Sequence, residues 1–212
     1  KGAVYIGELD FHEANPVFEV IDNYLSNQID TCCVIQLGAS SGKDIAFFAN
    51  KHPKHVFYYT DIYDSVAEYA ASVHNLLNLH YLTVPAEHLD IVASLTQMYR
   101  VLIFSSGSSQ YVYPENLDLM FQRLSLINGK EIVFVISEPA NNSEIDPLIF
   151  NGSQPRLNFS YTHNYNYYAV KHGFRQLEWR MISPYPVENY PERKGTVHLF
   201  GMFRRDNISK TG

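Results

Sequence analysis

The sequence is poor in cysteine: among 212 residues only Cys32 and Cys33 are cysteines, and they are adjacent in the chain. Neighbouring side chains of a strand point to opposite faces, so a disulfide between these two residues is disfavoured. A small domain held together by a framework of disulfides is thereby excluded. Two unpaired cysteines are typical of a reducing compartment, and we expect a cytoplasmic location.

Long hydrophobic runs and clustered positive charge are also missing. No apolar run approaches the roughly 20 residues that a membrane-spanning helix needs, so we expect no membrane insertion. The 16 lysines and arginines are scattered and the net charge is -6, which argues against nucleic acid as a partner. The chain starts without Met and without the apolar core of a signal peptide, and we expect a trimmed chain or a domain of a longer protein.

Hydrophobic residues make up 46% of the chain and charged residues 18%, which is the composition of a globular protein. A length of 212 residues suits an α/β domain with a full core, so we predict a single domain over residues 1–212. The histidines show no spacing to cysteines or carboxylates that is typical of a metal site, and we expect no metal.

Apolar runs alternate with stretches of helical periodicity over the first two thirds of the chain. The predicted strands are residues 32–37, 55–60, 79–84, 100–105 and 130–137. The predicted helices are residues 16–29, 42–51, 65–78, 87–99 and 114–127. This alternation predicts an α/β fold, in which parallel strands are joined by right-handed helical crossovers and helices cover both faces of the sheet.

The alternation ends after Ser137. Residues 138–163 form a long polar segment with three prolines and one glycine, and a segment of this length is a candidate substrate wall or lid. A short helix is predicted over residues 164–173, followed by strands at 175–182 and 196–203. Because the connection between these two strands has no helical periodicity, we predict that they pair antiparallel.

A turn with two glycines, Gly38 and Gly42, lies between the first predicted strand and the helix that follows it. Glycine permits a positive φ and lets a ligand approach the backbone amides at a helix start. Asp61 ends the second strand, where a carboxylate can accept hydrogen bonds from both hydroxyls of a ribose. The combination predicts a nucleotide-like cofactor, although the glycines could serve packing alone and Asp61 could cap the next helix.

The stretch VIQLGASSG, followed by YYTD, resembles the first two motifs of class I S-adenosylmethionine-dependent methyltransferases. The usual acid-x-Gly-x-Gly-x-Gly pattern is present as Gln36, Gly38, Ser40 and Gly42, with Gln36 replacing the acid and Ser40 the middle glycine. The resemblance covers about residues 32–204 and implies a Rossmann-like, doubly wound sheet of seven strands, mostly parallel with an antiparallel last strand. It also implies S-adenosylmethionine as cofactor and methyl transfer to a small-molecule acceptor, for which we favour a hydroxyl group.

The resemblance divides the chain and assigns parts of the cofactor to it. Residues 1–30 would be an N-terminal helix and lid, 31–137 the cofactor-binding core, 138–172 a substrate-side insertion and 173–205 the last two strands. The methionine portion is expected at Gly38, Ala39, Ser40 and Gly42, the ribose at Asp61, the adenine ring at Ile62, its amino group at Ala86 and Glu87, and the sulfonium at Ser105 and Ser106. Glu87 could equally complement a helix dipole, and the two serines could form only a polar turn.

The acceptor pocket is expected from the N-terminal segment and the insertion, which both combine aromatic residues with histidine and acids. A hydroxyl acceptor must lose its proton as the methyl group arrives, and a neutral imidazole suits this near pH 7. His163 and His12 lie in these two segments. We favour His163, because connections after the fifth strand emerge at the sheet edge that carries the glycine turn. His163 could instead cap the following helix, and alignment alone could explain the rate.

Two other functions stay open. GASSG resembles the cofactor turn of short-chain NAD(P)-dependent dehydrogenases, and Tyr167 and Lys171 have the spacing of their catalytic pair. However, Lys43 and Asp44 follow the turn where that family needs another glycine, and the next predicted strand follows Lys171 too closely for a long helix. The fold can also serve as a binding module without turnover.

Overall fold

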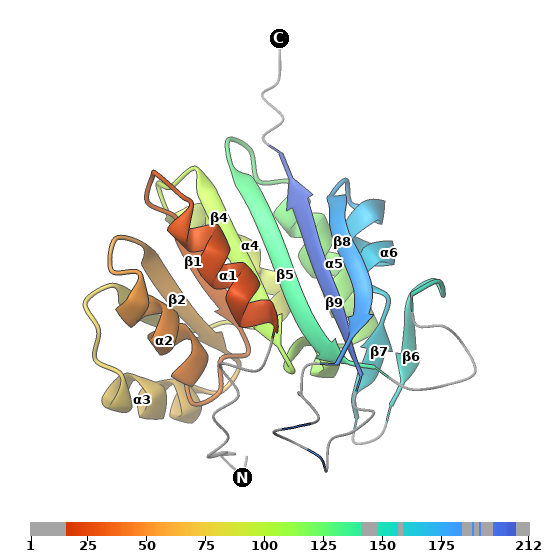
Figure 1. Cartoon of the computed structure of the whole chain (residues 1–212), viewed down its shortest axis with the longest axis horizontal. Helices are drawn as coiled ribbons and strands as arrows, with labels where there is room; N and C mark the ends of the chain where they lie inside the picture. The colour runs from red at the N-terminus through yellow and green to blue at the C-terminus, as the bar shows by residue number, and fades with distance from the viewer. Residues whose placement is uncertain are drawn as a thin grey trace.

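The computed structural model describes residues 16–140, 148–156, 159–183 and 197–206, together with residues 188 and 191. A seven-stranded sheet in the order β3-β2-β1-β4-β5-β9-β8 forms its centre (Figure 1). The strands are β1 (Cys33–Leu37), β2 (Val56–Asp61), β3 (Leu79–Thr83), β4 (Arg100–Ser106), β5 (Glu131–Pro139), β8 (Arg175–Ile182) and β9 (His198–Arg205). Neighbours among β1 to β5 pair parallel, whereas β9 pairs antiparallel with both β5 and β8. The predicted fold class and the antiparallel pairing of the last two strands are confirmed.

Helices cover both faces of the sheet, as predicted (Figure 1). On one face lie α1 (Pro16–Ser26), α2 (Lys43–Lys51) and α3 (Asp64–Val73); on the other lie α4 (Leu89–Leu95), α5 (Pro114–Ser125) and α6 (Tyr165–Lys171). Each face has its own hydrophobic cluster, and Cys32 packs in one while Cys33 packs in the other. Both cysteines are free and buried, so the prediction that their side chains point to opposite faces is confirmed.

The strand order has a switch point between β1 and β4, and folds of this type place their ligand crevice at the carboxyl ends of the strands there. The chain runs outward from β1 to β2 and β3, then returns to β4 on the other side of β1. Where the direction of winding reverses, the loops after the two central strands separate and leave room for a ligand. The carboxyl ends of β1, β2, β4 and β5 all lie at this edge, which is the lower edge in Figure 1.

A small hairpin of β6 (Ser153–Pro155) and β7 (Tyr161–His163) lies at the same end of the molecule (Figure 1). It packs near the short 3-10 helix η2 (Ser109–Tyr111), which follows β4. The sequence did not predict this hairpin, because strands of three residues are too short to show an alternating pattern. Part of the predicted substrate wall is therefore regular structure beside the crevice.

Helix α1 ends earlier than the predicted residue 29. The side-chain amides of Asn27 and Gln28 donate hydrogen bonds of 2.8 Å and 3.0 Å to the backbone carbonyls of Asn23 and Tyr24. Polar side chains that satisfy the last carbonyls of a helix replace the next helical turn. The predicted helices 65–78 and 87–99 are also shorter, since α3 ends at Val73 and the second splits into the 3-10 helix η1 (Ala86–His88) and α4.

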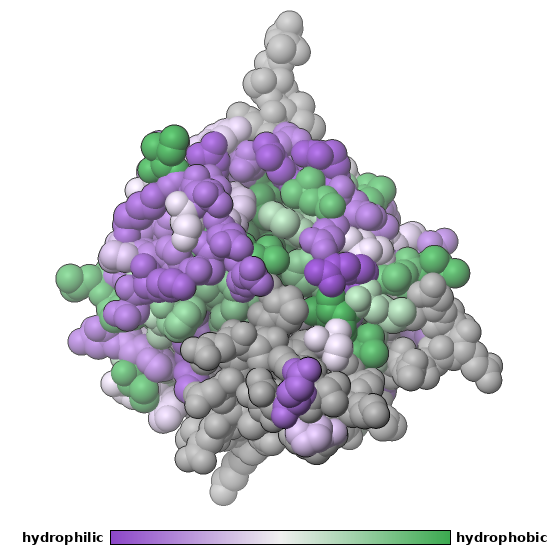
Figure 2. Space-filling view, viewed as in Figure 1, coloured by the Kyte–Doolittle hydropathy of each residue, from purple (hydrophilic) through white to green (hydrophobic). Residues whose placement is uncertain are grey.

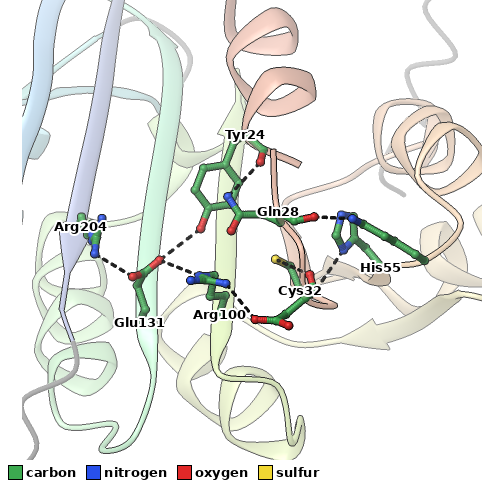
Figure 3. A network of polar contacts seen from close by, with 9 residues as sticks. Tyr24, Gln28, Cys32, His55, Arg100, Glu131 and Arg204 are labelled. Carbon is green, nitrogen blue, oxygen red and sulfur yellow. Dashed lines mark hydrogen bonds and ion pairs between the residues drawn. The ribbon is translucent and has the colours of Figure 1, made fainter. Parts of the chain in front are cut away.

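The opposite edge of the sheet is held by a polar network around Glu131 at the start of β5 (Figure 3). The buried carboxylate forms ion pairs with Arg204 at 2.8 Å and with Arg100 at 3.5 Å. The Tyr24 hydroxyl of α1 donates to it at 3.5 Å. The network therefore ties α1, β4, β5 and β9 together, far from the crevice edge.

His55, the residue before β2, joins the same region (Figure 3). Its Nδ1 accepts a hydrogen bond of 3.0 Å from the backbone N–H of Cys32, so its Nε2 carries the proton and donates to the carbonyl of Leu25 at 3.1 Å. Burial lowers the pKa of this imidazole below its usual value. His55 is therefore a neutral structural residue that closes the end of α1.

The surface over α1 and α2 is largely hydrophilic (Figure 2). No helix in the part of the chain that the structure describes is both long and apolar enough to cross a membrane.

Candidate functional site

The turn after β1 adopts the backbone conformation that its glycines predict. Gly38 has a φ of +64°, Ser40 of +47° and Gly42 of +76°. The N–H of Ala39 donates to the carbonyl of Thr60 at 2.9 Å, which fastens the turn to β2. A Cβ atom on Gly38 would lie 2.6 Å from the Cβ of Ser108 in the loop after β4. Glycine is therefore required at this position by close packing as well as by backbone conformation.

Asp61 faces this turn from the end of β2. Its Oδ2 accepts a hydrogen bond of 3.0 Å from the N–H of Ser40, and its Oδ1 accepts bonds of 2.8 Å and 3.3 Å from the N–H groups of Ile62 and Tyr63. A carboxylate offers about four acceptor positions, so Oδ2 retains capacity for one further donor. The N-cap residue of α3 is Tyr63, and no side chain caps the helix, so the alternative of Asp61 as the helix cap is wrong.

Gln36 stands where the family pattern has an acid. Its side chain is buried, its Nε2 lies 3.5 Å from Asp44 Oδ2, and its Oε1 has no hydrogen-bond partner in the described part of the chain. A buried acceptor without a donor is costly in a folded protein. Its place, where β1 runs into the glycine turn, suits a ligand that brings a donor.

The residue after Asp61 exposes apolar surface at the same edge. The side chain of Ile62 is 58% exposed, and that of the neighbouring Tyr63 is 56% exposed. The predicted contact of Ile62 with an adenine ring requires such accessible surface. More than half of each side chain is therefore accessible to a flat apolar ligand.

Ala86 and Glu87 lie in η1, directly after β3. Ala86 is buried, and the carboxylate of Glu87 accepts a hydrogen bond of 3.1 Å from the side chain of Asn116 on α5. The Arg123 guanidinium donates to the carbonyl of Glu87 at 2.9 Å. The structure therefore joins η1 to α5, and the Glu87 carboxylate already has a protein partner.

Ser105 and Ser106 end β4, and their backbone pairs with Ile136 and Ser137 of β5. Ser105 is buried, and its hydroxyl donates to Oε1 of Glu138 at 2.6 Å. Ser106 is half-buried beside the crevice. The hydrogen bond between Ser105 and Glu138 was not predicted, because the two residues are 33 positions apart in the sequence.

His163, the favoured base, lies in β7 and is completely buried. Its Nδ1 is 2.5 Å from the hydroxyl of Ser153, which is in turn 2.7 Å from the hydroxyl of Tyr168. Burial lowers the pKa of His163 to about 4, although the backbone of Val112 and Ser109 acts in the opposite direction. The Nε2 of His163 makes no hydrogen bond of good geometry among the described residues. The cap of α6 is Asn164, which accepts from the N–H of Tyr167 at 3.0 Å, so the capping alternative for His163 is wrong.

His12, the second candidate base, lies outside the described residues, as does most of the N-terminal segment that was expected to cover the acceptor.

No protein-family model matches the chain, and no curated protein matches it. Solved structures match over most of its length. An S-adenosylmethionine-dependent methyltransferase from Mesorhizobium loti is 16% identical, with a TM-score of 0.60 over 89% of this chain and 97% of that one. Geranyl diphosphate methyltransferase, in complex with GPP and sinefungin, is 12% identical, with a TM-score of 0.61 over 89% of this chain and 77% of that one. The chain has the class I methyltransferase fold.

The methyltransferase fold also occurs in proteins with another reaction. The [4+2]-cyclase SpnF matches at 11% identity, with a TM-score of 0.60 over 94% of this chain and 85% of that one. The fold therefore defines the architecture and the position of the crevice. The reaction depends on the residues at its edge.

The surroundings of Tyr167 and Lys171 argue against the dehydrogenase alternative, for which these two residues would be the catalytic pair. The ammonium of Lys171 contacts both carboxylate oxygens of Asp118 on α5, at 2.9 Å and 2.7 Å. Helix α6, which carries Tyr167 and Lys171, has only 7 residues. The pair therefore lies on a short helix docked on α5, where the lysine has a structural partner.

The described residues contain no group of three or more histidines, cysteines and carboxylates that could hold a metal ion.

Proposed function

We propose that the protein is an S-adenosylmethionine-dependent methyltransferase that acts on a hydroxyl group of a small-molecule acceptor. The observation that carries this proposal is the hydrogen bond from the Ser40 N–H to Asp61 Oδ2 at 3.0 Å. It joins the glycine turn to the acidic end of β2 at the crevice of a methyltransferase fold. Turn and carboxylate thus form one surface, which suits a ligand with a ribose and a charged tail.

The residues at this surface fit the cofactor in three ways. Asp61 Oδ2 retains capacity for a ribose hydroxyl, and Ile62 exposes apolar surface to an adenine ring. Gln36 Oε1 is a buried acceptor that suits the ammonium group of the methionine portion. When bound, S-adenosylmethionine supplies a methyl group activated by a sulfonium sulfur. The further contacts proposed for Gly38, Ala39, Ser40, Gly42, Ala86, Glu87, Ser105 and Ser106 follow from their places at the same edge.

The task of the chain is to align the acceptor and to exclude water. Alignment of two reacting groups in a dry site supplies much of the rate of a displacement reaction. His163 is the proposed proton acceptor, because a pKa of about 4 keeps its imidazole neutral at pH 7. The same low pKa makes it a weak base, so its contribution should be smaller than that of alignment. The hydroxyl of Ser153 at Nδ1 would orient the ring. Because Nε2 is enclosed in the described arrangement, the β6–β7 hairpin would have to shift for an acceptor hydroxyl to reach it.

Calorimetry with the demethylated product, S-adenosylhomocysteine, tests the proposal without knowledge of the acceptor. We expect binding of this ligand and no heat with NADPH. Binding of NADPH alone would favour the dehydrogenase, and binding of neither would favour a module without turnover. A panel of hydroxyl-bearing acceptors with isotopically labelled donor then tests methyl transfer itself, and a protein that binds the donor but labels none of the hydroxyls would contradict the acceptor class.

A further inference from the structure

Glu138, at the end of β5, is a buried acid for which the sequence assigned no role. Its side chain is 1% exposed. Its Oε1 accepts from the Ser105 hydroxyl at 2.6 Å and from the N–H groups of Ser108 and Ser109 at 3.2 Å and 3.1 Å. Its Oε2 accepts from the N–H of Gln110 at 3.3 Å. All four partners are donors, as an ionised carboxylate requires.

The loop after β4 is shaped around this carboxylate. Gly107 has a φ of +77°, and in the turn that follows, the N–H groups of Ser108, Ser109 and Gln110 all point towards the carboxylate of Glu138. Such a nest of backbone amides binds an anion. Ser109 and Gln110 are buried, at 0% and 8% exposure. Without the Glu138 carboxylate, the N–H of Gln110 would lose its partner away from water, and the N–H of Ser109 would keep only the Ser105 hydroxyl oxygen at 3.1 Å. Burial raises the pKa of Glu138 above its usual value, and the hydrogen bonds from Ser105, Ser109 and Gln110 oppose that rise.

The same loop holds the glycine turn. The hydroxyl of Ser108 donates to the carbonyl of Gly38 at 2.7 Å. The Cβ of Ser108 also fills the space that a side chain at position 38 would need. A displacement of Ser108 would therefore move the backbone that is proposed to surround the methionine portion of the donor.

The next two residues of the loop face the acceptor side. The hydroxyl of Ser109 is 2.8 Å from that of Tyr165 at the start of α6. The side-chain oxygen of Gln110 accepts from the Arg156 guanidinium, next to the β6–β7 hairpin, at 2.7 Å. Three consecutive residues thus link the donor turn to the acceptor-side segment, and Glu138 binds the backbone of all three.

We propose that Glu138 is a positioning residue for the methyl donor: it fixes the loop after β4 and, through Ser108, the carbonyl of Gly38. The proposal rests on the function proposed above. Glu138 does not touch the donor in this arrangement, so its effect must pass through Ser108. If Glu138 only stabilised the fold, its effect on donor binding would not depend on Ser108.

Strand β5 offers a matched control. Glu131 and Glu138 are both buried acids of one strand, but Glu131 lies at its other end and pairs with Arg204 and Arg100. Replacing either glutamate by glutamine keeps the size of the side chain and removes the charge. Both variants should lower stability, because each leaves buried partners of a carboxylate imperfectly paired. Only the Glu138 variant should weaken donor binding.

The test is a set of dissociation constants for S-adenosylhomocysteine, measured by calorimetry at a temperature where every variant is folded. Glu138→Gln should raise the constant about 10-fold and Ser108→Ala about 3-fold, the range expected when a charged or neutral hydrogen bond is lost. The double variant should stay near 10-fold, since both changes release the same carbonyl. Glu131→Gln should stay within about 2-fold of the wild type.

An unchanged constant for Glu138→Gln would overturn the proposal, as would a multiplied effect of about 30-fold in the double variant. If Glu138→Gln does not fold, Glu138→Asp keeps the charge but draws the carboxylate back from the loop, and it should raise the constant about 3-fold; no change there would again overturn it. A wild-type protein that does not bind S-adenosylhomocysteine would refute the proposed function itself, a result distinct from binding that is insensitive to Glu138.

Discussion

Substitution of Gly38 by alanine tests the packing of the glycine turn against the loop after β4. Gly38 has a φ of +64°, and an added Cβ would lie 2.6 Å from the Cβ of Ser108. A side chain in left-handed backbone costs about 1–2 kcal/mol, and an extra methyl group in a packed site costs about 1–3 kcal/mol. Gly38→Ala should therefore lower the free energy of unfolding by about 2–5 kcal/mol.

Two variants separate the two contributions. Gly129 has a φ of +76°, and an added Cβ there would meet nothing within 4 Å, so Gly129→Ala should lose only the backbone contribution of about 1–2 kcal/mol. Ser108→Gly removes the atom that Gly38→Ala would meet. In the Ser108→Gly background, Gly38→Ala should accordingly cost about as much as Gly129→Ala.

Urea unfolding followed by circular dichroism gives the free energies of the wild type, the three single variants and the double variant. Equal losses for Gly38→Ala and Gly129→Ala would refute the reasoning, and so would a loss for Gly38→Ala that does not shrink when Ser108 is glycine. Either result would mean that backbone conformation alone, and not the approach of Ser108, requires glycine in this turn.

Three further predictions concern the site. Asp61→Ala should weaken donor binding by about 1–3 kcal/mol, the effect of losing a charged hydrogen-bond acceptor, and an unchanged dissociation constant in calorimetry would move the ribose contact elsewhere. His163→Ala should lower turnover with a hydroxyl acceptor by about 100-fold while donor affinity is retained; near-normal turnover would remove His163 from the mechanism. Acid should lower the free energy of unfolding, because the pKa of His163 falls from 6.5 in the unfolded chain to about 4 in the folded protein. Above about pH 6.5 the imidazole is neutral in both states and has no effect on stability. As the pH falls from 6.5 to 4, only the unfolded chain binds the proton, and about 3 kcal/mol of stability is lost. A His163→Asn variant should lose less stability over that range in urea titrations, and a parallel pH dependence would contradict this assignment.

The sheet was predictable because its signals are local. Each of the first five strands is a short apolar run, and the absence of helical periodicity between residues 183 and 195 was enough to predict the antiparallel pairing of β8 with β9. The places of Gly38 and Asp61 at one edge followed from the same alternation of strand and helix.

The contacts that complete the site were not predictable, because their partners are distant in sequence. The bond between Ser108 and Gly38 spans 70 residues, and the bond between Ser105 and Glu138 spans 33. The sequence also gave no sign that His163 would be buried, since burial depends on how the β6–β7 hairpin packs on η2. Contacts between side chains that are distant in sequence can be identified only once the folded structure is known.

The two adjacent cysteines offer a way to follow each layer of the molecule separately. Cys32 and Cys33 pack in different hydrophobic clusters, and burial raises the pKa of the first thiol to about 11 and of the second to about 12. A thiol reagent reaches either residue only when the helices over that face open, since the reacting species is an accessible thiolate. With Cys33→Ala, labelling reports on the layer of α1, α2 and α3; with Cys32→Ala, it reports on the layer of α4, α5 and α6. Local opening on the two sides of one sheet thus becomes measurable in the same chain, without an added probe.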